Sequence, residues 1–340
     1  MNDGAPAPGA PAPGATTPGV TVPGGVLLLD KPAGLSSFQA LRPVKRAFPK
    51  TKIGHAGTLD PAATGLLLIG VGGGTRLLEY LEGMPKTYSF VAHFGAVSDS
   101  YDMESPLVPA EGEAAAKARV LDREKVEKAL EAFRGTISQT PPDYSAIKIQ
   151  GERACDRVRA GETVTLAARA VTIHSLELKS FAPALTAPPA TAASSNPEAT
   201  LASASFEMNC SKGTYVRSLV HDLGRSLGCG AVTDKIRRLA IGPFRVEDAR
   251  APESLAAGPG ALEPLLPLDA AVRHLPRAVL SEAGVAAFLQ GRAVDGNAYV
   301  SPDPVPGTEY RALDAHGRLI AIATLSPQGL LCPKKVLARN

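Results

Sequence analysis

Residues Lys52-Ile-Gly-His-Ala-Gly-Thr-Leu-Asp-Pro-Ala-Ala-Thr-Gly-Leu-Leu-Leu-Ile-Gly70 form the stretch around which the chain is organised. Glycines and Pro61 interrupt its first part, which is therefore neither a regular helix nor a regular strand, whereas the apolar run after Gly65 predicts a buried strand. A loop anchored on a core strand can hold one reactive side chain, and Asp60 is the candidate. The loop by itself favours a plain structural turn, because most Asp-Pro pairs do no chemistry.

Four other stretches favour a catalytic role for Asp60 over a plain structural turn. They are Val26-Leu-Leu-Leu-Asp-Lys-Pro-Ala-Gly34, Lys86-Thr-Tyr88, Tyr144-Ser-Ala-Ile-Lys148 and Cys210-Ser-Lys-Gly-Thr-Tyr-Val-Arg217. Together with Gly54 to Gly65, and in this order, they resemble the TruB family of pseudouridine synthases, the bacterial tRNA pseudouridine-55 synthases. Five ordered blocks are far more specific than one short motif, and the resemblance covers residues 25–270 closely.

The resemblance implies an α+β fold, the pseudouridine synthase fold, with a central mixed and mostly antiparallel sheet and flanking helices. We expect a disordered tail over residues 1–24, a catalytic domain over 25–270 and a PUA-like RNA-binding domain, small and β-rich, over 274–340. Within the catalytic domain, residues 141–161 correspond to a mobile flap. Residues 183–203 are rich in Ala, Pro, Thr and Ser and predict a flexible surface insertion.

Local signals predict several of the elements. Ser36 or Ser37 is expected to cap a helix that runs toward Phe48, and Pro43 is expected to kink or split it. Residues 99–121 are acidic and are expected to form a loop. Helices are predicted over Thr214 to Leu227 and over Glu282 to Leu289.

The implied reaction breaks the N1–C1′ bond of uridine and joins C5 to C1′, which requires an ionised carboxylate beside the sugar and base. By resemblance Asp60 supplies that carboxylate and Arg217 is its cationic partner. Tyr88 matches the tyrosine that lies against the uracil and assists removal of the C5 proton. These three residues are the predicted catalytic set.

Four further residues are predicted to bind the substrate, again by resemblance. Tyr215 and Ile236 match positions that line the pocket for the flipped base. His55 matches the histidine that enters the opened T loop. Lys31 matches a lysine that either contacts the substrate or braces the active-site loop.

No cofactor or metal is expected, because the isomerisation involves no redox step, phosphoryl transfer or outside reagent. The four cysteines lie far apart without a C-x-x-C pair, which argues against a zinc site or disulfides and fits a reducing cytosol. Residues Gly72 to Thr75 lack the Lys-Ser/Thr of a phosphate-binding loop and are expected to form a turn.

The expected partner is the T arm of tRNA. The net charge of +3 is small, but six Lys/Arg against two Asp between Asp30 and Asp60 support an RNA-facing surface. No membrane association is expected, because no signal peptide and no spanning run of about 18 apolar residues is evident. We expect a cytoplasmic protein, and nothing demands more than a monomer.

Three alternatives remain open. The first is an RNA-guided synthase subunit of the archaeal and eukaryotic type, which shares the Asp loop. The second is a non-catalytic tRNA-binding or folding factor, which would not need the set of Asp60, Tyr88 and Arg217. The third is a glycoside hydrolase, which normally needs a second, acidic carboxyl group, and no motif supplies one near Asp60.

Overall fold

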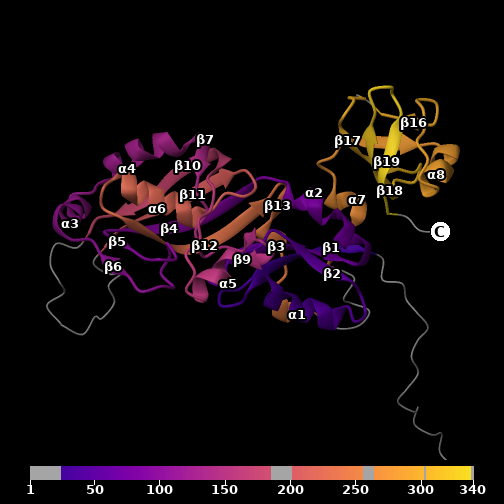
Figure 1. Cartoon of the computed structure of the whole chain (residues 1–340). Helices are drawn as coiled ribbons and strands as arrows, with labels where there is room; N and C mark the ends of the chain where they lie inside the picture. The colour runs from indigo at the N-terminus through magenta and orange to yellow at the C-terminus, as the bar shows by residue number, and fades with distance from the viewer. Residues whose placement is uncertain (1–23, 185–200, 256–263, 302–303, 338–340) are drawn as a thin grey trace, which may run out of the picture.

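The computed structural model describes residues 24–184, 201–255, 264–301 and 304–337 (Figure 1). Its larger sheet has ten strands, in the order β14-β1-β3-β12-β4-β11-β10-β7, with β2 paired to β3 and β13 paired to β12. These strands are β1 (Gly25–Lys31), β2 (Ile53–Ala56), β3 (Thr64–Val71), β4 (Lys86–Phe94), β7 (Gly135–Gln139), β10 (Arg169–Ala182), β11 (Ala202–Cys210), β12 (Ala231–Ile241), β13 (Phe244–Arg245) and β14 (Leu265–Pro267).

Helices lie on both sides of this sheet, and two short hairpins extend from it. These helices are α1 (Ser37–Ala47), α2 (Leu78–Glu82), α3 (Gly112–Arg119), α4 (Arg123–Leu130), α5 (Ala154–Arg159), α6 (Val216–Ser226) and α7 (Leu268–Ala271), whereas α8 (Glu282–Leu289) packs on the C-terminal sheet. The hairpins pair β5 (Ala96–Val97) with β6 (Val108–Pro109), and β8 (Lys148–Ile149) with β9 (Glu152–Arg153).

The sheet is mixed and mostly antiparallel, as predicted. Among the described strands of this sheet, β3 and β12 pair in parallel, through Arg237 with Thr64 and Arg238 with Gly65. The other pairs are antiparallel. The parallel pair is where the Asp60 loop, which precedes β3, meets the strand that carries Ile236.

Strands β1 and β3 are buried on both faces. On one face Leu27 and Leu29 pack with the apolar side of α1. On the other face Val26 and Leu28 pack with residues from α2 and from the C-terminal part of the chain. Because successive strand residues point to opposite faces, a continuously apolar run is what such a strand requires. The predicted core strands are confirmed.

Helix α1 begins where the sequence predicts. The Ser36 hydroxyl accepts a hydrogen bond from the Gln39 amide, and the Gln39 side chain accepts one from the Ser36 amide, which completes a capping box. Pro43 does not split the helix, contrary to one of the two expected outcomes. The apolar face of α1 stays buried against β1 and β3, and this packing holds the helix together despite the hydrogen bond that proline removes.

A second core lies between β4, β10 and β11 and the helices α4 and α6. Phe90 and Phe206 stack across β4 and β11 with ring centroids 5.3 Å apart. The predicted inward face of α6 is buried in the same core. This packing fixes the start of α6, and therefore the position of Arg217, over the sheet.

One expectation about loops is wrong, and two others concern residues that lie largely outside the described part of the chain. Residues 99–121 are not all loop, because Gly112–Arg119 forms α3. The sequence there, Gly-Glu-Ala-Ala-Ala-Lys-Ala-Arg, is rich in strong helix formers, and this local preference prevails over the acidic, loop-like surroundings. Residues 1–23 of the expected tail and 185–200 of the expected insertion lie outside the described residues.

The C-terminal part forms a separate five-stranded sheet, in the order β16-β15-β17-β18-β19, beside α2 and α7 (Figure 1). Its strands are β15 (Arg277–Leu280), β16 (Tyr299–Val300), β17 (Glu309–Leu313), β18 (Leu319–Leu325) and β19 (Leu331–Val336). Helix α8 has the predicted bounds. Leu313, Leu319 and Ile322 pack against the larger sheet's core, and Lys335 pairs with Glu79 of α2. No described helix has the length and apolar character needed to cross a membrane.

We expect Gly65→Ala to destabilise the protein strongly. Gly65 has φ +102°, and a Cβ there would lie 2.3 Å from the backbone oxygen of Arg238 in the paired strand. The strained φ and the backbone clash together predict a loss of about 3 kcal/mol or more of unfolding free energy. Denaturant unfolding measures it. The control is Gly317→Ala, at φ +81° with nothing within 4 Å of the added Cβ, where only the cost of about 1 kcal/mol for the strained φ is expected. Equal losses would contradict the steric argument.

Candidate active site

Asp60 lies in the turn between β2 and β3, and neighbouring segments hold this turn on two sides. The Leu59 amide donates a hydrogen bond to the Ser37 hydroxyl, at 2.8 Å, and the Ser37 hydroxyl donates one back to the Leu59 carbonyl. The Gly34 amide donates to the Pro61 carbonyl at 2.9 Å. The start of α1 and the turn after β1 therefore fix the residues on either side of Asp60.

Lys31 braces the same turn from beneath. Its ammonium group is fully buried and donates to the carbonyls of Pro32, Leu35 and Pro61, at 2.9, 2.6 and 3.1 Å. Burial lowers the pKa of Lys31 to about 8, so the group is still protonated at neutral pH and retains all three donors. Of the two roles considered from the sequence, the structure supports bracing, and Lys31 does not line the cavity described below.

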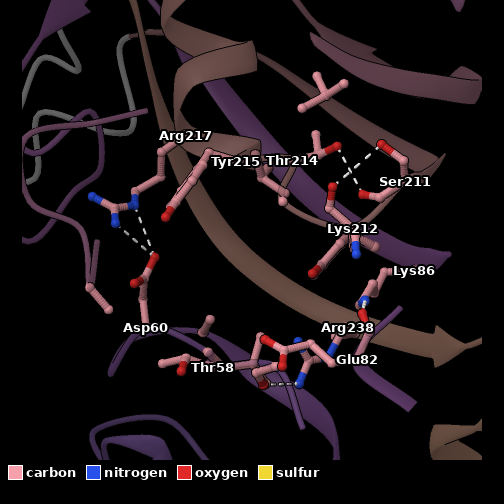
Figure 2. A pocket seen from close by; sticks show the side chains of 18 of the residues that line it. Thr58, Asp60, Glu82, Lys86, Ser211, Lys212, Thr214, Tyr215, Arg217 and Arg238 are labelled. Atoms are coloured by element: carbon pink, nitrogen blue, oxygen red, sulfur yellow. Dashed lines mark hydrogen bonds and ion pairs between the residues drawn. The ribbon is translucent and has the colours of Figure 1, made fainter. Parts of the chain in front are cut away.

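The predicted partner of Asp60 is in place. Arg217 Nε donates to Asp60 Oδ2 at 2.9 Å, and Nη2 lies 2.9 Å from the same oxygen. Figure 2 shows the two side chains pointing toward each other. Arg217 is only 4% exposed, whereas Asp60 is 39% exposed, so the carboxylate faces open space and the guanidinium is enclosed behind it.

Arg217 joins three further groups from distant parts of the chain. Its Nη1 donates to the Ser100 carbonyl and its Nη2 to the Tyr144 carbonyl, both at 2.8 Å. Asp102 Oδ2 lies 3.7 Å from Nη1. Arg217 therefore links the Asp60 turn, the 98–104 loop, the segment that carries Tyr144, and α6. Because these contacts engage all three guanidinium nitrogens, they fix the orientation of the guanidinium and, with it, that of the Asp60 carboxylate.

Asp102 is a site residue that the sequence did not reveal. Its side chain is buried, and Oδ1 accepts hydrogen bonds from the Ser100 hydroxyl and the Glu104 amide. The residue between Ser100 and Asp102 is Tyr101, which has φ +62° and stacks on His221 of α6 with ring centroids 3.9 Å apart. This turn aims both a carbonyl and a carboxylate at Arg217.

We expect Asp102→Asn to slow the reaction about tenfold, which corresponds to about 1.4 kcal/mol of activation free energy. The amide retains an acceptor for the Glu104 amide but removes the charge that helps to orient Arg217. RNA affinity should be unchanged, since Asp102 does not line the cavity. Single-turnover rates and binding titrations test this. The matched control is Asp99→Asn, an exposed carboxylate in the same loop. A normal rate for Asp102→Asn would show that Arg217 needs no second carboxylate.

A cavity of about 790 Å³ opens beside Asp60. Five of the seven predicted site residues line it, and they come from four separate segments: Asp60, Tyr88, Tyr215, Arg217 and Ile236. Cations gather along the rest of its wall, where Figure 2 shows Lys86, Lys212 and Arg238 across the cavity from Asp60. The lining thus combines two aromatic rings and several cations with three carboxylates, Asp60, Glu79 and Glu82, of which Asp60 is the one paired with Arg217.

His55 is not part of this lining. It lies in β2 opposite Ile69 of β3, is half-buried, and its Nδ1 is buried without a hydrogen-bond partner in the described structure. Burial, reinforced by Arg238, lowers the pKa of His55, so the ring is neutral at neutral pH. The predicted contact of His55 with RNA stays a prediction.

Arg238 and Lys86 are two buried cations that line the cavity and that sequence reasoning did not assign. Arg238 is 1% exposed and donates to the carbonyls of Leu66 and Gly57, at 2.7 and 3.0 Å. Lys86 donates to the carbonyls of Glu82 and Met84, and burial lowers its pKa to about 8. Lys86 begins one of the quoted sequence blocks, whereas Arg238 lies outside all of them, and the Arg-Arg pair at 237–238 was the available signal. Arg237 instead pairs with Asp30.

Tyr88 is enclosed by the cavity wall, and burial raises the pKa of its phenol. Arg238 opposes this rise in part. The hydroxyl is therefore protonated at neutral pH and can donate a hydrogen bond.

In the part of the chain that the structure describes, no group of three or more His, Cys, Asp and Glu side chains could hold a metal ion.

Comparison with known proteins places this chain in a family. The model of the TruB family pseudouridylate synthases, N-terminal domain, matches residues 45–216. The chain belongs to the TruB family. A TruB-family relative in Nitrosospira multiformis, named tRNA pseudouridine synthase B, is 38% identical over 318 residues, which cover 92% of this chain and 95% of that protein. One of the same name in Zymomonas mobilis is 41% identical over 280 residues, covering 80% and 84%.

Solved structures agree with the TruB-family fold. A chain from a crystal structure of a Cbf5-Nop10-Gar1 complex superposes with a TM-score of 0.67, covering 92% of this chain and 85% of that one. Its sequence identity is 23%, so this likeness bears on the fold alone. The predicted α+β pseudouridine synthase fold is confirmed.

Proposed function

We propose that this protein converts uridine 55 in the T loop of tRNA to pseudouridine. The observation that carries the proposal is the Asp60–Arg217 pair at the edge of a cavity lined by Tyr88, Tyr215 and Ile236. Such a cavity lies within the usual size range of small-ligand sites and can admit a single flipped nucleotide. The names of the TruB-family relatives support tRNA as the substrate.

In the proposed mechanism, the target nucleotide leaves the RNA stack and enters the cavity. Unstacking costs a few kcal/mol, and stacking on an aromatic ring returns about 1–3 kcal/mol. Tyr88 and Tyr215 supply such rings, and Ile236 supplies an apolar wall. Burial raises the pKa of the Tyr88 phenol, so its hydroxyl is protonated as the base enters and can donate a hydrogen bond to it. As the family resemblance implies, Tyr88 also assists removal of the C5 proton.

Asp60 then acts on the nucleotide as a carboxylate, either as a nucleophile or as a stabiliser of the cationic sugar. The N1–C1′ bond breaks, the uracil turns within the cavity, and C5 bonds to C1′. C5 loses its proton and N1 gains one, so the overall change is an isomerisation. Arg217 orients the Asp60 carboxylate during these steps. Lys31 acts as a positioning residue, because it holds the turn that carries Asp60.

The remaining assignments are part of the same proposal. His55 contacts the opened T loop, residues 141–161 close on the RNA, and the C-terminal sheet belongs to a PUA-like domain of residues 274–340 that binds RNA. A cytoplasmic monomer is sufficient for this activity. The domain division is supported by the change of sheet between β14, which pairs with β1, and β15.

The test uses the purified protein and an unmodified tRNA transcript, without guide RNA or partner proteins. Pseudouridine is mapped by carbodiimide labelling and primer extension, and we expect a single modified position, in the T loop. Binding without modification would favour the non-catalytic tRNA factor. Modification only after a guide RNA and partner proteins are added would favour the RNA-guided subunit. The identity of 38–41% with the bacterial relatives supports the stand-alone enzyme.

A further inference from the structure

Strand β12 carries one extra residue at the point where it reaches the cavity. Asp234 pairs with Val91 of β4, but the next pair in the ladder is Arg237 with Ser89. Lys235 and Ile236 therefore lie opposite the single residue Phe90. This arrangement is a β-bulge, which shifts the alternation of side chains by one position.

The bulge determines which β12 side chains reach the cavity. Ala231 and Thr233 pair with Phe94 and Ala92 on the face of β4 that also bears Tyr88. Strict alternation would continue this face with Lys235 and Arg237. Because of the extra residue, Ile236 and Arg238 occupy it instead, and both line the cavity. An apolar wall thus stands where a flexible lysine would otherwise project.

One carboxylate fastens the bulge. Lys235 has φ +52°, a left-handed conformation that is strained for a non-glycine residue. Asp234 Oδ1 accepts a hydrogen bond from the Lys235 amide at 2.7 Å. Its other oxygen, Oδ2, lies 3.4 Å from Nε2 of His93 in β4. The half-buried Asp234 side chain therefore connects the strained residue to the neighbouring strand.

We propose that Asp234, supported by His93, is a positioning residue that holds the β12 bulge and thereby sets Ile236 and Arg238 in the wall of the uridine cavity. Asp234 itself is not among the residues that line the cavity. This inference rests on the proposed function, since its consequence is measured as the rate of pseudouridine formation. RNA binding over the surrounding surface does not depend on the bulge.

The test compares three variants with the wild type in single-turnover assays on tRNA transcript. Asp234→Ala removes both contacts and should lower the rate about tenfold, while the dissociation constant for tRNA stays within about twofold. Asp234→Asn keeps the Oδ1 acceptor for the Lys235 amide and should remain within about threefold of the wild type. In Asp234→Ala/Lys235→Gly, glycine adopts the positive φ without strain, so the rate should recover.

A control variant and the wild type separate the possible outcomes. Glu207→Ala removes a half-exposed carboxylate from β11 and should keep the wild-type rate. A wild-type rate for Asp234→Ala, or a double variant as slow as that single variant, would overturn the inference. If Asp234→Ala does not fold, a slow but folded Asp234→Asn with full tRNA affinity would overturn it. Absence of pseudouridine with the wild type would instead refute the proposed function.

Discussion

Replacing Asp60 by asparagine is expected to abolish pseudouridine formation without loss of the fold or of tRNA binding. The buried Arg217 guanidinium keeps Asp102 as a counter-charge after this change, and the amide oxygen of residue 60 can still accept a hydrogen bond from it. An amide neither attacks carbon readily nor stabilises a cationic sugar. We therefore expect a rate reduction of about 10⁴-fold or more, measured as pseudouridine formed per enzyme in single-turnover assays.

The matched control for this change is Asp99→Asn, which alters an exposed carboxylate outside the cavity lining. It should retain the wild-type rate. Thermal unfolding and tRNA titration of both variants show whether fold and binding persist. An Asp60→Asn variant with more than trace turnover would mean that another group performs the chemistry.

Arg217→Lys is expected to have the second largest effect. Lysine keeps the positive charge, but a single ammonium cannot span Asp60, the carbonyls of Ser100 and Tyr144, and Asp102 as the guanidinium does. Asp60 would lose its fixed orientation. We expect a rate loss of about 10²- to 10³-fold and a change in tRNA affinity of less than about threefold.

Measuring rate and tRNA affinity separately distinguishes a role of Arg217 in orienting Asp60 from a role in binding an RNA phosphate. If Arg217 only bound a phosphate of the RNA, the Arg217→Lys variant would lose both tRNA affinity and the rate at limiting RNA. Its rate would then recover at saturating RNA. Arg217→Ala should in addition destabilise the protein by about 3 kcal/mol, since it leaves the buried Asp102 without its cation. Equal losses of rate and affinity for Arg217→Lys would contradict the orienting role.

Local sequence patterns predicted the elements of the fold that depend on residues close together in the chain. The apolar run before Gly72, the serine cap of α1 and the inward face of α6 follow directly from periodicity and capping. The pairing of Asp60 with Arg217 spans 157 positions and came from the family resemblance, not from spacing.

Other parts depend on tertiary packing and could not be predicted from local patterns. Asp102 lies in an irregular loop, and only the fold brings it to Arg217. The bulge at Lys235 is likewise invisible in the sequence, because no glycine marks the left-handed residue. Lys31 and His55 show a third case, in which a motif identifies a residue but its burial decides whether it can reach the cavity.

The most direct measurement of the central claim is a crystal structure of the Asp60→Asn variant bound to an unmodified tRNA T arm. The proposed function predicts an everted uridine in the 790 Å³ cavity, with its base against Tyr88 and its C1′ beside the residue 60 side chain. A uridine that stays stacked in the RNA, or one that is everted into any other part of the protein, would contradict it.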